Sequence, residues 1–260
     1  MSNFLIPDSF PTLPSAVQKM QAMFSQGEVN TKQLVELLQS DPLLCANILK
    51  IVNSAHYGLP NKVSAVNQAV MLLGTTIIRG IVMAAMLKKS FALNLTPYNI
   101  TIEQFDQICS LRARFINSWA KEFEVDIQTL VAAAFLMESG KIVTSNIIVQ
   151  NHYISQFLEL LKTQSIEDAE KSLFAADSYT VAGILFQKWD FEKKFTDMIT
   201  GILQSNSLEQ KLLHVSAVLF STEGILTQTN IQKASQLLEE YGLASENFKT
   251  VVSSLQKEIA

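Results

Sequence analysis

The chain has 260 residues, of which 48% are hydrophobic and 17% are charged, so it can fill a sizeable core and is not a disordered protein. Its net charge of -4 at pH 7 excludes a strong overall attraction to nucleic acid or to anionic lipid. Two local basic pairs, Lys88 with Lys89 and Arg112 with Arg114, are interpreted as solvated helix faces. We therefore predict no nucleic-acid partner.

Helical periodicity dominates the first hundred residues and predicts three short helices at the start of the chain. Their predicted starts are Pro14 at the first helical position, Asn30 in a capping box with Gln33, and Asp41 followed by Pro42. The third helix is expected to break at Gly58. Ser64 is then predicted to cap a short helix that ends at Gly74, and a new helix follows at once.

Residues 92–99 contain the last proline and several turn formers, so they are the best candidate boundary within the chain. We predict an N-terminal helical subdomain over residues 1–95 and a larger helical subdomain over residues 96–260. In the second, the predicted helix caps are Thr101 with Gln104, Asp126, Ser165 with Asp168, Asp177 or Ser178, and Ser207 with Gln210; Gly242 ends the penultimate helix.

The segment 141–149 is the only one that is rich in β-branched residues. An isolated strand there would leave its backbone groups without partners, so we predict a helix. No other segment shows the alternation of a hairpin strand. The predicted fold class is therefore all-α.

Cysteine usage and the chain start favour a reducing compartment. Cys45 and Cys109 lie in apolar helical patterns and form no C-x-x-C pair. The first residues lack the features of a signal peptide, and the longest apolar run, residues 130–137, is too short to cross a bilayer. We expect a soluble cytoplasmic protein with no membrane partner.

Metal-binding residues are sparse. The three histidines, His56, His152 and His214, belong to no H-x-x-x-H, H-E-x-x-H or H-D pair. The stretch that ends in Gly140 and Lys141 also fails as a phosphate loop, because Phe135 stands where the first glycine would be needed. We predict no metal and no cofactor.

A series of local motifs carries a family resemblance. They are Leu13-Pro14, Asp41-Pro42, Asn53-Ser54-Ala55 with Tyr57-Gly58, the helix start at Ser64, and Leu73-Gly74 followed by Arg79. In this order they resemble the opening half of HDOD domains, bacterial all-α modules related to HD-type metal phosphohydrolases. The resemblance continues more weakly over most of the chain. It implies a multi-helical HD-domain or phosphodiesterase-like fold with an N-terminal helical bundle, the two predicted subdomains together making one HDOD domain.

The resemblance also implies where metal ligands would lie. In the HD superfamily a lone His, an adjacent His-Asp pair and later residues including an Asp hold the metal. The corresponding positions here are Cys109, Met137 with Glu138, Ser178, and a residue near Ala217. The ligand types are lost at nearly every position, so we expect these positions to be vestigial and the chain not to be an enzyme.

The helix end at the vestigial His-Asp position is expected to be kept. Gly140 is predicted to take a left-handed cap and Lys141 to lie at the helix C-terminus. Apolar Met137 and Ala217 are expected to belong to a core that is repacked to fill the vacated site.

The motif residues that remain are mostly explicable as structure, with a hinge or recognition surface as the functional alternative. They are Asn53, Ser54, Tyr57, Gly58, Gly74 and Arg79. Arg79 is expected to hold a carboxylate or helix-end carbonyls.

Three functions stay open at this point. The first, which we favour, is a non-catalytic bacterial signal-transduction module that binds protein partners, or a small anionic ligand. The second is a divergent metal-dependent phosphohydrolase with a rebuilt site at Glu138, Asp177 and one histidine. The third is a nucleotide-type ligand-binding protein that uses the vestigial cleft.

Overall fold

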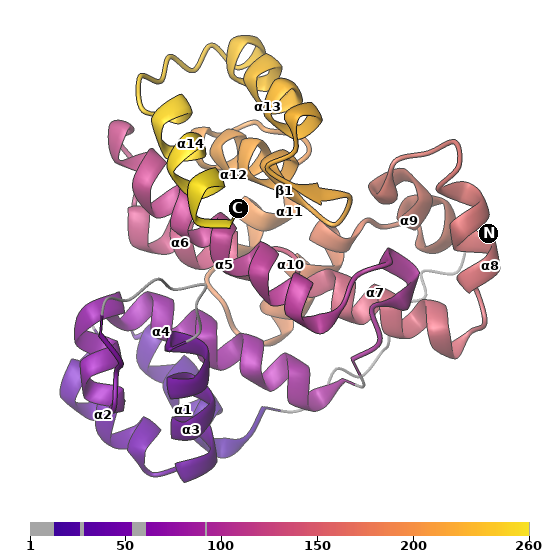
Figure 1. Cartoon of the computed structure of the whole chain (residues 1–260). Helices are drawn as coiled ribbons and strands as arrows, with labels where there is room; N and C mark the ends of the chain where they lie inside the picture. The colour runs from indigo at the N-terminus through magenta and orange to yellow at the C-terminus, as the bar shows by residue number, and fades with distance from the viewer. Residues whose placement is uncertain (1–12, 27–28, 54–60, 92, 260) are drawn as a thin grey trace.

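A computed structural model describes residues 13–26, 29–53, 61–91 and 93–259 (Figure 1). The N-terminal helices are α1 (Ser15–Ser25), α2 (Thr31–Gln39), α3 (Pro42–Val52) and α4 (Val66–Ser90). The middle of the chain forms η2 (Thr96–Tyr98), α5 (Ile102–Trp119), η3 (Ala120–Glu122), α6 (Ile127–Leu136), α7 (Ser139–Gln150), α8 (Ile154–Leu160), α9 (Ile166–Phe174) and α10 (Ser178–Lys188). The rest forms α11 (Lys193–Thr200), α12 (Leu208–Leu219), β1 (Phe220–Ser221), β2 (Gly224–Ile225), α13 (Gln228–Glu240) and α14 (Phe248–Ile259).

The predicted all-α class is confirmed, and the segment 141–149 is helical as expected, inside α7. One small element was missed: β1 and β2 form an antiparallel hairpin that pairs Phe220 with Ile225 and Ser221 with Gly224. Strands of two residues are too short to show an alternating pattern, so the sequence carried no signal for them. The predicted sites Ser54, Tyr57 and Gly58 lie outside the described residues.

Most predicted caps are confirmed. Side-chain oxygens of Asn30, Asp41, Asp126, Ser165 and Asp177 accept hydrogen bonds from backbone N–H groups of the following helix turn. Full capping boxes form at Thr101 with Gln104 and at Ser207 with Gln210. Gly242 follows α13 with a φ of 65°, as a C-terminal cap requires.

The predicted starts at Pro14 and Ser64 are each one residue early. Pro14 precedes the first helical residue, and the N-cap of α4 is Ala65. Ser64 instead donates its backbone N–H and its hydroxyl to the Gln68 side chain. Gly74 breaks the helical path as predicted, with a φ of 79° and a ψ of 163°, so α4 is one element with a kink.

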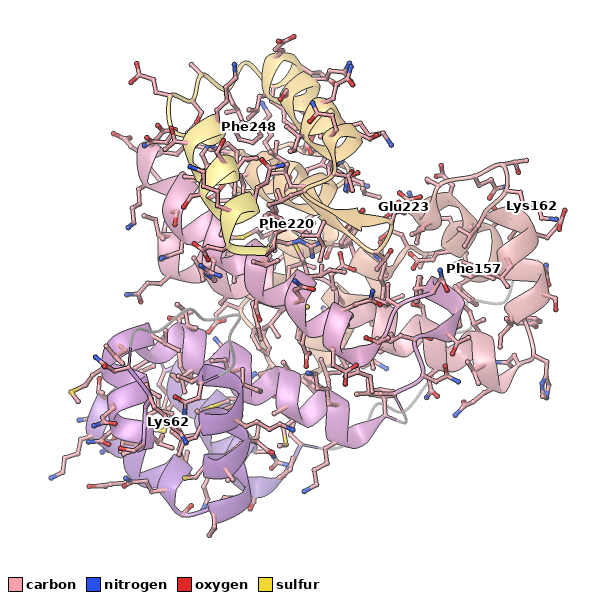
Figure 2. The ribbon with its side chains drawn as sticks, viewed as in Figure 1. Lys62, Phe157, Lys162, Phe220, Glu223 and Phe248 are labelled. Atoms are coloured by element: carbon pink, nitrogen blue, oxygen red, sulfur yellow. The ribbon has the colours of Figure 1, made fainter. Side chains whose placement is uncertain are left out.

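Helix α4 lies between the N-terminal bundle and the rest of the molecule, where it packs against α2 and α3 and against α6 and α7 (Figure 1). A connected apolar core extends from Val17 in α1 to Leu255 in α14. Within the C-terminal part, Phe115 packs on Phe220 and Phe248, with ring centres 5.6 and 6.0 Å away. Figure 2 labels Phe220 and Phe248 in this part of the molecule. A subdomain boundary at residue 95 stays a prediction, since α4 contributes to both sides.

Arg79 of α4 joins the two parts and is only 5% exposed. Its Nη1 donates to both carboxylate oxygens of Glu192, at 3.0 and 2.9 Å, and its Nε donates to Gln21 Oε1 at 2.7 Å. The guanidinium carbon lies 4.6 Å from the ring centre of Phe24 and 4.0 Å from that of Phe191. Arg79 therefore holds a carboxylate, as expected, and does so as a buried tie between α1 and the α10–α11 connection.

The predicted cap at Gly140 is wrong. Helix α6 ends at Leu136, α7 begins at Ser139, and Gly140 lies in the first turn of α7 without a positive φ. Lys141 accordingly sits at the start of a helix and not at its end. The glycine is needed for space, because a Cβ there would lie 1.7 Å from the carbonyl oxygen of Ser178 in α10.

We expect Gly140→Ala to lower the free energy of unfolding by at least about 3 kcal/mol, because α7 and α10 would have to separate. The matched control is Gly80→Ala in α4, where a Cβ would meet nothing nearer than 3.8 Å. That change should leave stability unchanged or raise it by about 0.5–1 kcal/mol through helix propensity. Chemical denaturation measures both, and equal effects would contradict the close approach.

Candidate functional site

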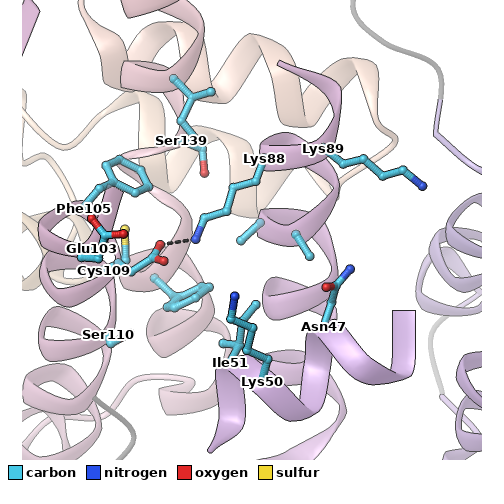
Figure 3. Close-up of a pocket in the computed structure, with 15 residues that line it drawn as sticks. Asn47, Lys50, Ile51, Lys88, Lys89, Glu103, Phe105, Cys109, Ser110 and Ser139 are labelled. Carbon is cyan, nitrogen blue, oxygen red and sulfur yellow. Dashed lines mark hydrogen bonds and ion pairs between the residues drawn. The ribbon is translucent and has the colours of Figure 1, made fainter. Parts of the chain in front are cut away.

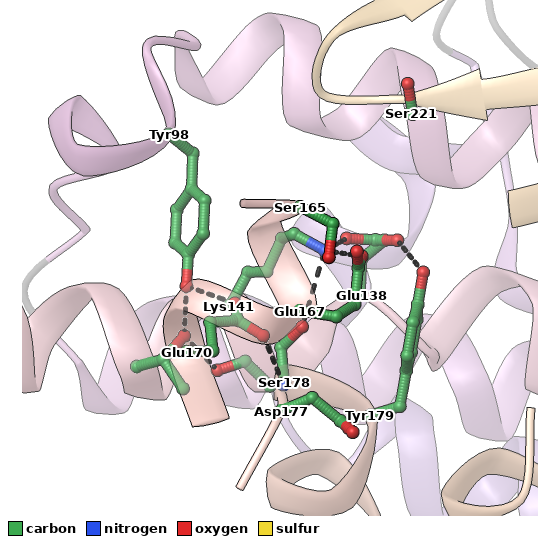
Figure 4. A network of polar contacts seen from close by, with 12 residues as sticks. Tyr98, Glu138, Lys141, Ser165, Glu167, Glu170, Asp177, Ser178, Tyr179 and Ser221 are labelled. Atoms are coloured by element: carbon green, nitrogen blue, oxygen red, sulfur yellow. Dashed lines mark hydrogen bonds and ion pairs between the residues drawn. The ribbon is translucent and has the colours of Figure 1, made fainter. Parts of the chain in front are cut away.

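The turn between α6 and α7 is the place where the resemblance to HD-type enzymes predicts the His-Asp pair. Met137 and Glu138 occupy it, both with right-handed backbone conformations. Met137 is fully buried in the core and Glu138 is 2% exposed. The carboxylate of Glu138 is therefore the polar centre of this region (Figure 4).

Two cationic side chains hold Glu138. Arg112 of α5 places its Nη1 2.9 Å from Oε1, and Lys141 of α7 places its Nζ 2.8 Å from Oε2. Arg112 Nη2 also donates to the backbone carbonyl of Phe220 in β1. We refer to Arg112, Glu138 and Lys141 as the buried ion cluster.

The interpretation of Arg112 as a solvated residue is wrong, because its side chain is completely buried. Helix α5 packs against α6, α12, α14 and β1, which leaves this position no access to water. The other basic residues fit the interpretation better. Arg114 pairs with Glu258, half-buried Lys88 pairs with Asp106, and Lys89 is exposed.

The ion cluster fixes the protonation of its members. Burial raises the pKa of Glu138, but the charges of Lys141 and Arg112 outweigh it and hold this pKa at about 2, against an ordinary 4.5. Burial lowers the pKa of Lys141, and Glu138 more than reverses this. Since the folded-state pKa of Glu138 is depressed, its contribution to stability is present above pH 4.5 and is lost as pH falls through 2.

A second buried carboxylate, Glu170 of α9, lies behind the first. Its Oε1 lies 2.6 Å from Tyr98 Oη, and its Oε2 accepts from the backbone N–H of Ser178 at 2.6 Å. Tyr98 Oη also contacts Thr144 Oγ1, which donates to the carbonyl of Gly140 at 3.1 Å. These contacts tie η2, α7, α9 and α10 together.

Proton counting favours a neutral Glu170. The chain of oxygens Glu170, Tyr98, Thr144 and Gly140 contains three contacts, and the two hydroxyls supply two protons. A protonated carboxyl supplies the third. Burial is also the main reason that the pKa of Glu170 is raised, from 4.5 to about 7.

Glu170→Gln should therefore gain stability over the parent as pH rises. A raised folded-state pKa means that the contribution of Glu170 is complete below pH 4.5 and is lost as pH rises through 7, by about 3 kcal/mol. The amide can donate to Tyr98 and accept from Ser178 at every pH. Denaturation at pH 4.5 to 8 measures the difference, with Glu167→Gln on the same helix as control. A difference that does not change with pH would contradict a neutral Glu170.

A small cavity of about 120 Å³ opens beside the ion cluster, and Glu138, Tyr179, His214 and Ala217 are among its lining residues. Tyr179 Oη donates weakly to Glu138 at 3.4 Å. The ring of His214 is engaged elsewhere, with its Nδ1 2.6 Å from Tyr241 Oη. Burial lowers the pKa of His214, which favours its neutral form.

The cluster of Glu138, Asp177 and a histidine, on which a rebuilt hydrolase site would depend, is not assembled. Asp177 caps α10 by accepting from the N–H of Thr180, and it pairs with Lys171. His152 has a φ of 60° at the turn after α7, and His56 lies outside the described residues. Only His214 shares a cavity with Glu138.

The chemistry of the vestigial positions does not fit a divalent cation. Met137 and Ala217 offer no suitable donor, and Ser178 accepts a hydrogen bond from Lys141 at 3.3 Å. The one carboxylate, Glu138, already faces two fixed positive charges that would repel a metal ion. Among the described residues, no group of three His, Cys, Asp or Glu side chains could hold a metal.

The remaining predicted positions lie apart from this centre. Cys109 lines a different cavity between α4 and α5, and burial raises the pKa of its thiol to about 12. Asn53 donates its side-chain amide to the carbonyls of Leu49 and Val63 and accepts from the N–H of Val63. It thus fastens the end of α3 to the approach to α4, in line with a structural role.

Sequence reasoning missed Arg112, Tyr98 and Glu170 as members of this network and misjudged the role of Lys141. A partial signal was available for Arg112, which follows Cys109 by three residues and so lies near it on one helix face. Nothing in the local pattern of residues 96–98 or 166–174 indicates that Tyr98 and Glu170 meet across the fold.

We expect Glu138→Gln to destabilise the protein by about 3–5 kcal/mol at pH 7, because it leaves two buried cations without a counter-charge. Denaturant titration checks this. The matched control is Glu159→Gln, whose pair with Lys162 is exposed and should contribute less than about 1 kcal/mol. The difference in unfolding free energy between Glu138→Gln and the parent protein should become smaller as pH falls from 4.5 toward 2. Equal losses for the two variants would contradict a structural ion cluster.

Two segments, Val66–Lys89 and Ile127–Gln150, are long and apolar enough to cross a bilayer by composition. The second is divided by the turn between α6 and α7, and it is largely buried in the fold. A cytoplasmic location and the absence of a membrane partner stay predictions.

Comparison with known proteins places this geometry in a family. The family model of the HDOD domain matches residues 10–204. An uncharacterized protein of Treponema pallidum (strain Nichols) is 31% identical over 67 residues, which is 26% of this chain and 13% of that protein. The match therefore spans only a small part of that relative.

Two crystal structures share the arrangement of helices. A virulence factor of Campylobacter jejuni subsp. jejuni is 27% identical, with a TM-score of 0.53 over 97% of this chain and 91% of that chain. A provisionally named phosphohydrolase of Shewanella amazonensis SB2B is 18% identical, with a TM-score of 0.75 over 96% of this chain and 91% of that chain. The predicted HD-like fold is confirmed. Since the family model covers most of the sequence, this chain belongs to the HDOD domain family.

Proposed function

We propose that this HDOD protein is a non-catalytic regulatory module that acts by binding a protein partner. The observation that carries the proposal is the buried ion cluster. At the position where an HD-type enzyme has its His-Asp pair, Glu138 is neutralised by Arg112 and Lys141.

Hydrolysis of the HD type depends on a metal ion that carries positive charge and lowers the pKa of a bound water. Here the positive charge comes from a guanidinium and an ammonium that are held in place by Glu138. These groups can stabilise the fold without a metal, but they cannot coordinate a water and activate it. The replacement thus supports a structural role for the former catalytic position.

The two alternatives receive less support. A rebuilt hydrolase site lacks its ligands, since Asp177 and His214 are bound to other partners. A nucleotide-sized ligand needs a pocket of roughly 300–1,000 Å³. The cavity beside Glu138 measures about 120 Å³, which is too small for that class of ligand.

A candidate partner surface lies on α4, just before its kink at Gly74. Met71 and Leu72 are 72% and 62% exposed, and they are the most exposed large hydrophobic residues that the structure describes. Two adjacent apolar side chains in water are a feature that a protein partner can cover.

The experiment measures metal and activity in one preparation. After incubation with Mn²⁺, Mg²⁺ or Zn²⁺ and desalting, elemental analysis should find far less than one ion per chain, and phosphomonoesters and cyclic dinucleotides should stay uncleaved. A stoichiometric ion together with chelator-sensitive hydrolysis would overturn the proposal. A known HD-type phosphohydrolase, treated in parallel, controls for the assay.

The second part of the proposal, binding of a protein partner, is tested by immobilising the same protein, incubating it with cell extract and cross-linking what binds. One discrete protein should be retained, and Met71→Ser with Leu72→Ser should release it while the melting temperature is unchanged. Lys62→Glu, a change at another exposed position, is the control. Retention that ignores the double change would rule out this surface.

A further inference from the structure

A larger cavity, separate from the one beside Glu138, lies where α3 and α4 meet α5, α6 and α7 (Figure 3). Its volume is about 490 Å³. This is within the roughly 300–1,000 Å³ range of small-molecule sites, which often lie between packed lobes. Cys109 is one of its lining residues.

The cavity wall is largely apolar. Ile51, Phe105, Phe135 and Ile142 supply its large side chains, and Ala84 and Ala85 leave room between them. Phe105 and Ile142 are only 4% and 3% exposed, so this surface belongs to the core. Such a wall suits an apolar body of aliphatic or aromatic character.

Two hydroxyl groups line this wall without partners. Ser110 and Ser139 are 5% and 4% exposed, and both border the cavity. Neither hydroxyl makes a hydrogen bond to any part of the protein that the structure describes. Both residues line the cavity, so their hydroxyls are free to form hydrogen bonds with a polar substituent of a ligand.

Charged residues of both signs border the cavity. They are Lys50, Lys88, Lys89, Glu103 and Asp106. Lys88 is paired with Asp106. Figure 3 shows Lys50 reaching from α3 toward the cavity while Lys89 points away from it.

Lys50 is therefore the cation best placed for a ligand. It forms no ion pair with the described residues. Asn47, one helical turn earlier on α3, also lines the cavity and adds an amide that can donate to an anion.

We propose that this cavity binds a small amphipathic anion, whose carboxylate or phosphate is held by Lys50 and Asn47 and whose apolar body lies on the wall formed by Phe105, Phe135 and Ile142. The site differs from the vestigial cleft, and it goes beyond the proposed function. Binding is non-covalent, because Cys109 stays a protonated thiol at neutral pH.

Calorimetric titration of the full chain with decanoate and with 4-phenylbutyrate tests the proposal. The two probes also distinguish a ligand with an aliphatic, lipid-derived body from a ligand with an aromatic body. At least one of the two should bind saturably at one site, and its neutral amide should bind at least tenfold more weakly. Isotope-labelled isoleucine methyl groups should report the contact at Ile142. Failure of both anions to bind, or equal binding of the amides, would overturn the proposal.

Three variants locate the site. Lys50→Glu should weaken binding at least tenfold, Ala84→Leu should weaken it by filling the cavity, and Lys62→Glu on the bundle surface should change nothing (Figure 2). Melting temperatures establish that each variant is folded. Unchanged affinity in both Lys50→Glu and Ala84→Leu would place the ligand elsewhere. Metal content and partner capture are measured independently, so failure here leaves the proposed function standing.

Discussion

The fold depends on a carboxylate that is buried between two cations. Glu138 sits at the turn where α6 passes into α7, and its partners come from α5 and from the first turn of α7. A buried charge is strongly unfavourable unless it is paired, so this cluster constrains three segments at once. Because Arg112 also donates to the carbonyl of Phe220, the constraint extends to the hairpin after α12.

The net energy of such a cluster is modest, since the desolvation of three ionised groups offsets most of their attraction. Its effect is better described as positional. A shift of α7 by one residue would move Lys141 away from Glu138, and the close approach of Gly140 to Ser178 restricts the same helix from its other side. Together, one electrostatic and one steric constraint set the register of α7 against α5 and α10.

Local features of the fold could be predicted from the sequence, and contacts between distant segments could not. Caps such as Asp126 and Ser207 depend on residues within one helical turn, so the pattern carries the physical cause. Gly140 shows the limit. A glycine followed by lysine is typical of a helix end, but the deciding fact is the close approach of the α10 backbone at Ser178, which is distant from Gly140 along the chain. Arg112 was misjudged for the same reason, because its burial depends on α12 and β1.

The turn between α6 and α7 shows how a buried carboxylate can be stabilised by charges from within the protein. Without a counter-charge, a carboxylate in apolar surroundings is strongly unfavourable. In this chain Lys141 and Arg112 supply that counter-charge, while Met137 is part of the core. The stability of the folded state therefore depends on pH through Glu138 and Glu170.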